Sequence, residues 1–199
     1  MFAAGQSVTL AERLGASSRI RDAVLVLASS FAIGLLAQAE IRLPWTPVPV
    51  TLQPLAVFLL GAALGSRRAA ITMLVYLAEG AAGLPFFAGG TAGLARLLGP
   101  TGGYLVGFVP AAFVIGFLAE HGWDRTPHRA FAAMFLGSIV LFGCGLVRLA
   151  AFVPREQVLS LGLTPFVVGD LLKMLAAAGL LPAVWKLLER GGFRPSPTP

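Results

Sequence analysis

The sequence predicts an all-α, polytopic membrane protein with six transmembrane helices and with both termini in the cytoplasm. Of its 199 residues, 57% are hydrophobic before the 24 glycines are counted, and only 12% are charged. Soluble domains carry about 25% charged residues, so this chain has too few polar side chains to cover a globular surface. We expect a single transmembrane domain over residues 1–199, with a membrane core at 22–189 and cytoplasmic tails at 1–21 and 190–199.

Four apolar stretches are each long enough to cross a bilayer, and they lie at residues 23–39, 102–119, 130–153 and 165–188. A further apolar region, 52–80, is interrupted by the adjacent Arg67 and Arg68. An arginine at the bilayer centre costs about 2.5–3.5 kcal/mol on insertion scales, so we expect the chain to turn at this pair and leave both side chains at a membrane surface. The region therefore predicts two short spans, which must tilt or border a cavity.

The first stretch has a second interpretation, a cleaved signal peptide. A basic start and an apolar run precede the small-residue sequence Ala37-Gln38-Ala39, which resembles a cleavage site. However, the Pro-rich segment 42–49 leads directly into the next apolar stretch, as is typical of a polytopic protein, and cleavage would leave an odd number of helices. We therefore favour a membrane-spanning first helix.

Basic residues are distributed unevenly between the two sides of the predicted bundle. With a cytoplasmic N-terminus, ten Lys or Arg residues fall in cytoplasmic segments, and three, Arg42, Arg96 and Arg155, fall in outer loops. This bias follows the positive-inside rule. The net charge of +6 thus comes mainly from cations that flank membrane lipid, and no basic run interleaved with aromatics indicates nucleic-acid binding.

The outer connection between the third and fourth spans, residues 80–107, contains nine glycines. Glycine permits positive φ angles and close approach of the backbone to a ligand or helix. The same segment contains apolar residues such as Phe86, Phe87 and Leu97, which are unsuited to a solvated linker. We expect it to fold back over the outer end of the bundle as a packed lid.

Four ionisable residues are predicted near that outer end: Glu79, Arg148, Asp170 and Lys173. Asp170 and Lys173, three positions apart on a helix, share one face. Because intramembrane charges usually face a bundle interior or a cavity, they predict a binding site that opens outward. Two structural alternatives stay open: an Asp170–Lys173 ion pair that ties helices together, and an Arg148 that pairs with Glu79 or caps loop carbonyls.

Patterns typical of catalysis or metal binding are absent from the sequence. It has no Walker A motif, no His-Glu-x-x-His and no cysteine cluster, since Cys144 is the only cysteine. An intramembrane aspartyl protease would need a second aspartate facing Asp170, but Asp22 and Asp124 are predicted on the cytoplasmic side. We expect a binding or transport protein without catalytic residues, metal or cofactor, not an enzyme.

Four motifs lie in the segments 46–53 (TPVPVTLQ), 83–90 (GLPFFAGG), 98–108 (LGPTGGYLVGF) and 169–173 (GDLLK). In order and spacing they resemble the BioY family, the biotin-specific S components of energy-coupling-factor (ECF) transporters. The resemblance covers nearly the whole chain. It implies a multi-pass S component of the cell membrane that holds one biotin beneath the loops after helices one and three. Its partners would be a transmembrane coupling subunit and a pair of cytoplasmic ATPases.

The resemblance also suggests how the predicted site would hold biotin. Asp170 would accept a hydrogen bond from a ureido N–H, Lys173 would donate to the ureido carbonyl, and Arg96 would bind the carboxylate, although the two cations could exchange ends. The other expected contacts, to a ureido N–H or to the rings, come from Glu79, Gly89, Gly90, Thr91 and Tyr104.

The first helix carries Ala28 and Ala32, which match a small-residue motif of the family. Small residues at this spacing allow close helix approach, so this face is expected to meet the coupling subunit. Two other classes of function stay open. A stand-alone secondary transporter of a small organic anion would accumulate substrate without ATPases, and a structural or assembly protein of the membrane would bind no ligand.

Overall fold

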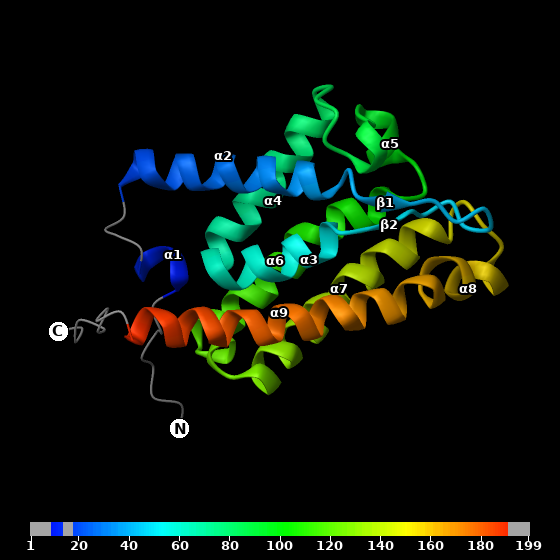
Figure 1. Ribbon diagram of the computed structural model, residues 1–199. Helices are drawn as coiled ribbons and strands as arrows, with labels where there is room; N and C mark the ends of the chain where they lie inside the picture. Colours follow the sequence, from blue (N-terminus) through cyan, green and yellow to red (C-terminus); the bar gives the residue numbers. More distant parts are fainter. Residues whose placement is uncertain (1–8, 14–17, 191–199) are drawn as a thin grey trace.

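The computed structural model describes residues 9–13 and 18–190, and in that part of the chain helices dominate (Figure 1). Six long helices occupy the six predicted apolar segments: α2 (Arg19–Leu36), α3 (Gln53–Leu64), α4 (Ser66–Ala81), α6 (Gly102–Glu120), α7 (Pro127–Leu149) and α9 (Thr164–Arg190). The predicted helical fold is therefore confirmed. The predicted tails fall largely on residues 1–8, 14–17 and 191–199, which lie outside the described residues.

Within the described residues, three helical segments are long and apolar enough to cross a membrane on their own. They are Gly102–Glu120, Pro127–Leu149 and the continuous segment Arg155–Arg190, which ends with α9. The helix α3 is apolar but has only 12 residues, in agreement with the prediction of short spans in this region.

The connections contain short elements that the sequence did not predict: α1 (Leu10–Arg13), η1 (Ala88–Gly90), α5 (Leu94–Leu98), η2 (Trp123–Arg125), η3 (Arg155–Gln157) and α8 (Val158–Gly162). The Pro-rich loop after α2 also closes as an antiparallel ribbon of β1 (Glu40–Ile41) and β2 (Val50–Thr51). Its prolines cannot donate backbone hydrogen bonds and disfavour helix, so the loop pairs its extended ends instead.

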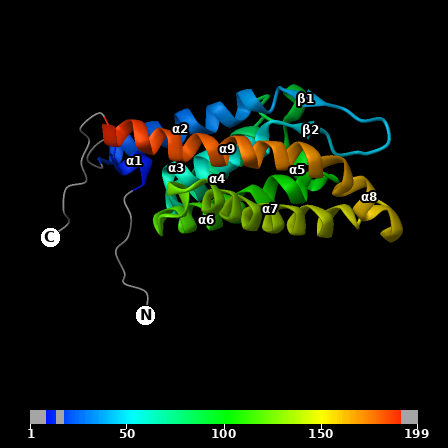
Figure 2. The ribbon, with the colours of Figure 1, turned by 60° about the horizontal axis from the view of Figure 1, so that its bottom comes forward.

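The molecule has two distinct ends. Figure 1 places α1 and the last turns of α9 at one end, and the β1–β2 ribbon, α5 and α8 at the other, which we call the lid end. The rotated view in Figure 2 shows the same division, with α6 and α7 running alongside each other between the two ends. Because the number of long helices is even, α9 ends at the same end of the bundle at which α2 begins.

The helix α6 is the centre of the bundle, because it packs against α3, α4 and α7. Its glycines permit that proximity: a Cβ on Gly103 or Gly107 would press on the backbone of α7 near Cys144 and Leu141. The helix α2 packs on α3 and α4 at one edge of the bundle, and α9 packs on α3 and α7 at another.

The turn between α3 and α4 falls at Gly65, two residues before the predicted position. Gly65 has φ of 81°, a conformation that glycine adopts without strain. The following Ser66 donates to the Glu120 carboxylate from its backbone nitrogen (2.7 Å) and its hydroxyl (2.9 Å). As expected, Arg67 is exposed, and Arg68 lies at the same end, where it pairs with Asp22 at 3.1 Å.

We predict that Gly116→Ala on α6 lowers the thermal stability of the detergent-purified protein. A Cβ there would lie only 2.5 Å from the carbonyl carbon of Gly65 and from the nitrogen of Ser66. The backbones would have to separate, and overpacking of this kind typically costs about 1–3 kcal/mol. The matched control is Gly143→Ala on α7, where an added Cβ meets no atom within 4 Å. Equal melting temperatures for the two variants would contradict the prediction.

Candidate functional site

A cavity lies at the lid end, between the loop before α3, the segment 87–101 and the helices α6, α7 and α9. Its walls are mainly apolar and aromatic, and the aromatic lining residues are Phe87, Tyr104, Phe108, Phe142 and Phe166. The polar lining residues are Thr51, Gln53, Thr91, Arg96, Thr101, Asp170 and Lys173. Mostly apolar walls with a few placed polar groups are typical of small-molecule sites.

Three aromatic rings from different helices form one wall. The Tyr104 ring of α6 lies edge-on to Phe142 of α7 at 6.1 Å between centroids, and Phe166 of α9 lies 6.2 Å from Phe142. The Tyr104 hydroxyl donates to the Gly162 carbonyl at 2.8 Å, so this group holds α8 in place and the ring is left to face the cavity. Gly145 makes room for the ring, because a Cβ there would strike it.

The wall supplied by α9 carries an ion pair between Asp170 and Lys173. Lys173 Nζ lies 2.7 Å from Asp170 Oδ1, and the two side chains are only 10% and 4% exposed. The structural alternative required a pair that ties helices together. The observed pair joins two residues of one helix, so it does not do this. A buried ion pair is expensive to desolvate and is weak evidence for stability, which favours a role in recognition.

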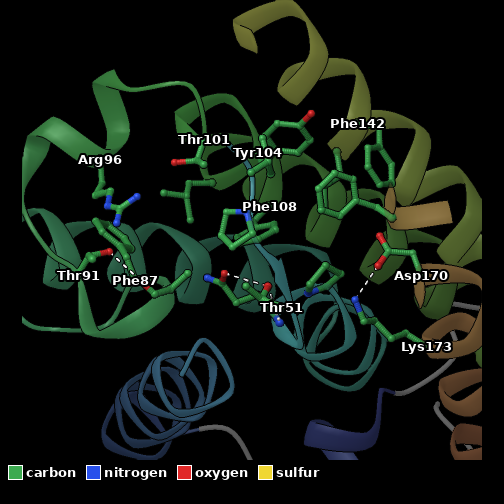
Figure 3. Close-up of a pocket in the computed structure, with 18 residues that line it drawn as sticks. Thr51, Phe87, Thr91, Arg96, Thr101, Tyr104, Phe108, Phe142, Asp170 and Lys173 are labelled. Atoms are coloured by element: carbon green, nitrogen blue, oxygen red, sulfur yellow. Dashed lines mark hydrogen bonds and ion pairs between the residues drawn. The ribbon is translucent and has the colours of Figure 1, made fainter. Parts of the chain in front are cut away.

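Arg96 of α5 supplies a second charged group to the cavity lining. We call the Asp170–Lys173 pair and Arg96 the two poles of the cavity. Figure 3 shows Arg96 at one side of the cavity and the Asp170–Lys173 pair at the other, with the rings of Phe108 and Tyr104 between them. A guanidinium offers a planar fork that suits a carboxylate. The arrangement therefore fits an elongated molecule with a hydrogen-bonding head, an apolar middle and an anionic end.

Five of the eight predicted ligand-contacting residues line this cavity: Thr91, Arg96, Tyr104, Asp170 and Lys173. The other three do not. Gly89 and Gly90 shape the lid, with φ of 63° and 71°, and Gly89 packs against the Glu40 carboxylate. Glu79 of α4 is half-buried, and its Oε2 atom has no hydrogen-bond partner among the described residues.

Sequence reasoning missed Thr51 and Gln53 as lining residues, although both belong to the motif at 46–53. Their side chains are buried, and the Thr51 hydroxyl donates to Gln53 Oε1 at 3.1 Å. Two polar residues directly before and at the start of an apolar helix, Thr51 in β2 and Gln53 as the first residue of α3, were the signal that could have identified them. The phenylalanines gave no such signal, because aromatic residues in a membrane span can equally face lipid.

Arg148 follows one of its two structural alternatives. Its guanidinium donates to the carbonyls of Leu98 and Gly99, which end α5, and Arg148 is not among the residues that line the cavity. It therefore fixes the helix that carries Arg96.

Ala28 and Ala32 lie on α2, away from the cavity lining. Ala28 is exposed and Ala32 is half-buried, and the neighbouring Phe31 and Leu35 are more than half exposed. This face of α2 is therefore open to lipid or to another protein.

At the opposite end, Asp124 of η2 is buried and accepts a hydrogen bond from Trp185 Nε1 at 2.5 Å. Burial raises the pKa of the Asp124 carboxyl, and this hydrogen bond opposes the shift. Among the described residues, no group of three or more His, Cys, Asp or Glu side chains is placed to hold a metal ion.

Comparisons with known proteins agree with one another. The family model described as the BioY family matches residues 8–190. A biotin transporter BioY from Thermotoga maritima is 39% identical over 154 residues, which cover 77% of this chain and 90% of that protein. One from Rhizobium etli is 40% identical over 181 residues, covering 82% and 92%. The crystal structure of an S component for biotin from an ECF-type ABC transporter superposes with a TM-score of 0.77 and 25% identity, over 86% of this chain and 95% of that one.

Proposed function

The chain belongs to the BioY family, and from this we propose that it captures biotin at the outer face of the cell membrane as the S component of an ECF transporter. It is a multi-pass membrane protein and a transport subunit, not an enzyme. The observation that carries the proposal for this chain is the cavity with polar poles at opposite sides of an aromatic lining.

The chemistry of biotin matches the two poles. Its ureido group has two N–H donors and one carbonyl, which complement the carboxylate of Asp170 and the ammonium of Lys173. Its bicyclic ring with a thioether is apolar and fits between aromatic side chains. Its flexible tail ends in a carboxylate, which Arg96 is suited to bind. Biotin therefore uses both poles and the lining between them.

We assign six membrane spans to the six long helices, with both termini in the cytoplasm. Support comes from the position of α1 and the end of α9 at the same end of the bundle, and from Arg67 and Arg68 there. Under this orientation the lid end faces outward. The partners are then a transmembrane coupling subunit, which we place on the Ala28 and Ala32 face of α2, and cytoplasmic ATPases that hydrolyse ATP for it.

The direct test is biotin binding to the detergent-purified protein, and Asp170→Asn should weaken it by about tenfold or more. An amide is a weaker acceptor than a carboxylate, and a charge-assisted hydrogen bond contributes about 1.5–3 kcal/mol. The control is Asp124→Asn, which changes a buried carboxylate at the opposite end of the bundle. Unchanged affinity in a folded Asp170→Asn protein would remove this residue from the site, and no binding by the unsubstituted protein would refute the function.

Replacement of Arg96 by Ala should weaken binding of free biotin far more than binding of a biotin amide, because only the free acid carries the carboxylate. Dissociation constants of both ligands, measured by calorimetry, check this. Arg155→Ala serves as the control, since it removes an exposed cation in η3, at a residue that does not line the cavity. Equal losses for the acid and the amide would count against the assignment.

A double replacement of Ala28 and Ala32 by Leu should leave biotin binding nearly intact and reduce ATP-driven uptake. Two added isobutyl groups on one face of α2 push a partner helix away from close approach. Copurification with the coupling subunit, together with uptake of labelled biotin, provides the measurement.

The matched control for this interface is the double replacement of Ala176 and Ala183 by Leu, because both alanines are exposed on α9. It should retain the partner and the uptake. The interface assignment fails if the α2 variant keeps its partner, or if it loses biotin binding and expression together.

A further inference from the structure

Two loops that are distant in the sequence cover the cavity. The first loop, residues 37–52, contributes Val48, Pro49 and Thr51 to the lining, and the second loop, residues 82–101, contributes Phe87, Ala88 and Thr91 among others. Under the proposed function, bound biotin leaves outward past these two loops. The contacts that join the loops to each other therefore bear on how long a ligand stays bound.

Tyr76 of α4 lies beneath both loops and is fully buried, with an exposed fraction of 0%. Its hydroxyl accepts a hydrogen bond from Gln53 Nε2 at 2.5 Å and donates one to the Phe86 carbonyl at 3.1 Å. Gln53 directly follows the first loop, and Phe86 belongs to the second. One oxygen atom thus connects the two loops through the core.

The Tyr76 ring supports the same segment by packing. It lies edge-on to the ring of Phe87, with 5.7 Å between centroids and an interplanar angle of 81°. Phe87 is 1% exposed and lines the cavity, whereas Tyr76 is not among the lining residues. Tyr76 therefore acts on the cavity through its neighbours and not by direct contact with a ligand.

The hydrogen bonds of Gln53 fix the orientation of its side-chain amide, so that the amide nitrogen faces the Tyr76 hydroxyl. Its amide oxygen accepts from the Thr51 hydroxyl at 3.1 Å, which leaves the amide nitrogen to point at Tyr76. Gln53 and Thr51 are only 4% and 9% exposed. Without the Tyr76 hydroxyl, the buried amide of Gln53 and the partly buried carbonyl of Phe86 would both lose a partner, and an unsatisfied buried group is costly.

Other links between the loops lie nearer to solvent. Gln38 Nε2 donates to the Pro85 carbonyl at 3.1 Å, and Glu40 packs against Gly89 while it pairs with Arg42 at 2.6 Å. Gln38 is exposed, and the Arg42 side chain is 66% exposed. Water competes for such contacts, so each contributes little. The link through Tyr76 is the buried one.

We propose that Tyr76 is a positioning residue that makes the two loops move as one unit and thereby slows the release of bound biotin. The proposal rests on the proposed function for the identity of the ligand. The joining of the loops through Tyr76 is a property of the ligand-free protein and can be tested without biotin.

The test variant is Tyr76→Phe, which removes the hydroxyl oxygen and keeps the ring against Phe87. Biotin should dissociate about tenfold faster, because the closed loops lose one buried and one partly buried hydrogen bond. Its association rate should rise as well, because the same two hydrogen bonds hold the loops together in the ligand-free protein. Both rates can be measured with labelled biotin on the detergent-purified protein.

The matched control is Thr72→Val, one turn earlier on the same helix. Thr72 is also 0% exposed, but its hydroxyl donates to the Arg68 carbonyl at 2.9 Å, within α4 itself. This variant also removes a buried hydroxyl, yet it should leave biotin dissociation unchanged. Equal acceleration in both variants would overturn the proposal.

Hydrogen exchange of the ligand-free proteins separates a positioning role from a general loss of stability. Tyr76→Phe should raise amide exchange in peptides from both loops and leave α7 and α9 unchanged. Unchanged exchange in the loops, or faster exchange in every helix, would overturn the proposal. If the unsubstituted protein does not bind biotin, the proposed function fails, and the exchange experiment still decides whether Tyr76 joins the loops.

Discussion

The close approach of α6 to its neighbours is the constraint on which the rest of this structure depends. Where α6 meets α7, glycines let backbone pack on backbone, and a Cβ on Gly103 would collide with the carbonyl of Cys144. At the other end, Gly116 lies against the turn at Gly65. Because α6 is held at both ends, the rings that it carries near the lid end meet those of α7 and α9. The aromatic lining of the cavity is thus a consequence of helix packing.

Several charged groups in this apolar bundle have partners close by, whereas the Oε2 atom of Glu79 has none among the described residues. Asp170 and Lys173 satisfy each other within one turn of α9, and Arg148 satisfies the carbonyls that end α5. An unsatisfied polar group in a low-dielectric interior is costly, so the chain places its charges at one cavity and at the ends of the helices. The cavity has a neutralised ion pair at one side and a guanidinium at the other. It can therefore accept a ligand with a single negative charge without burying an unpaired charge.

The edge helix α2 connects the exposed face at Ala28 with the lid. The Phe86 ring lies against Gly34, where a Cβ would be 2.8 Å from the ring, and edge-on to Phe31 at 5.8 Å between centroids. Phe31 is itself more than half exposed on the face that carries Ala28. The helix proposed to meet a partner therefore also supports the second loop over the cavity, so the proposed interface and the cavity lie near each other.

The sequence by itself determined the helical class, the positions of the six long helices, the break near Arg67 and five of the lining residues. Apart from Thr91 and Tyr104, which only the resemblance to the family suggested, these features follow from local quantities: the length of apolar runs, the cost of a charge in lipid and the spacing of residues on a helix. Tertiary structure decided the rest. It placed Gly89 and Gly90 in the lid turn, left Glu79 outside the lining, and brought Gln53, Tyr76 and Phe86 together. In an apolar helix, the hydropathy pattern does not distinguish a face that packs on protein from one that faces lipid, so only the packed bundle defines which side chains meet.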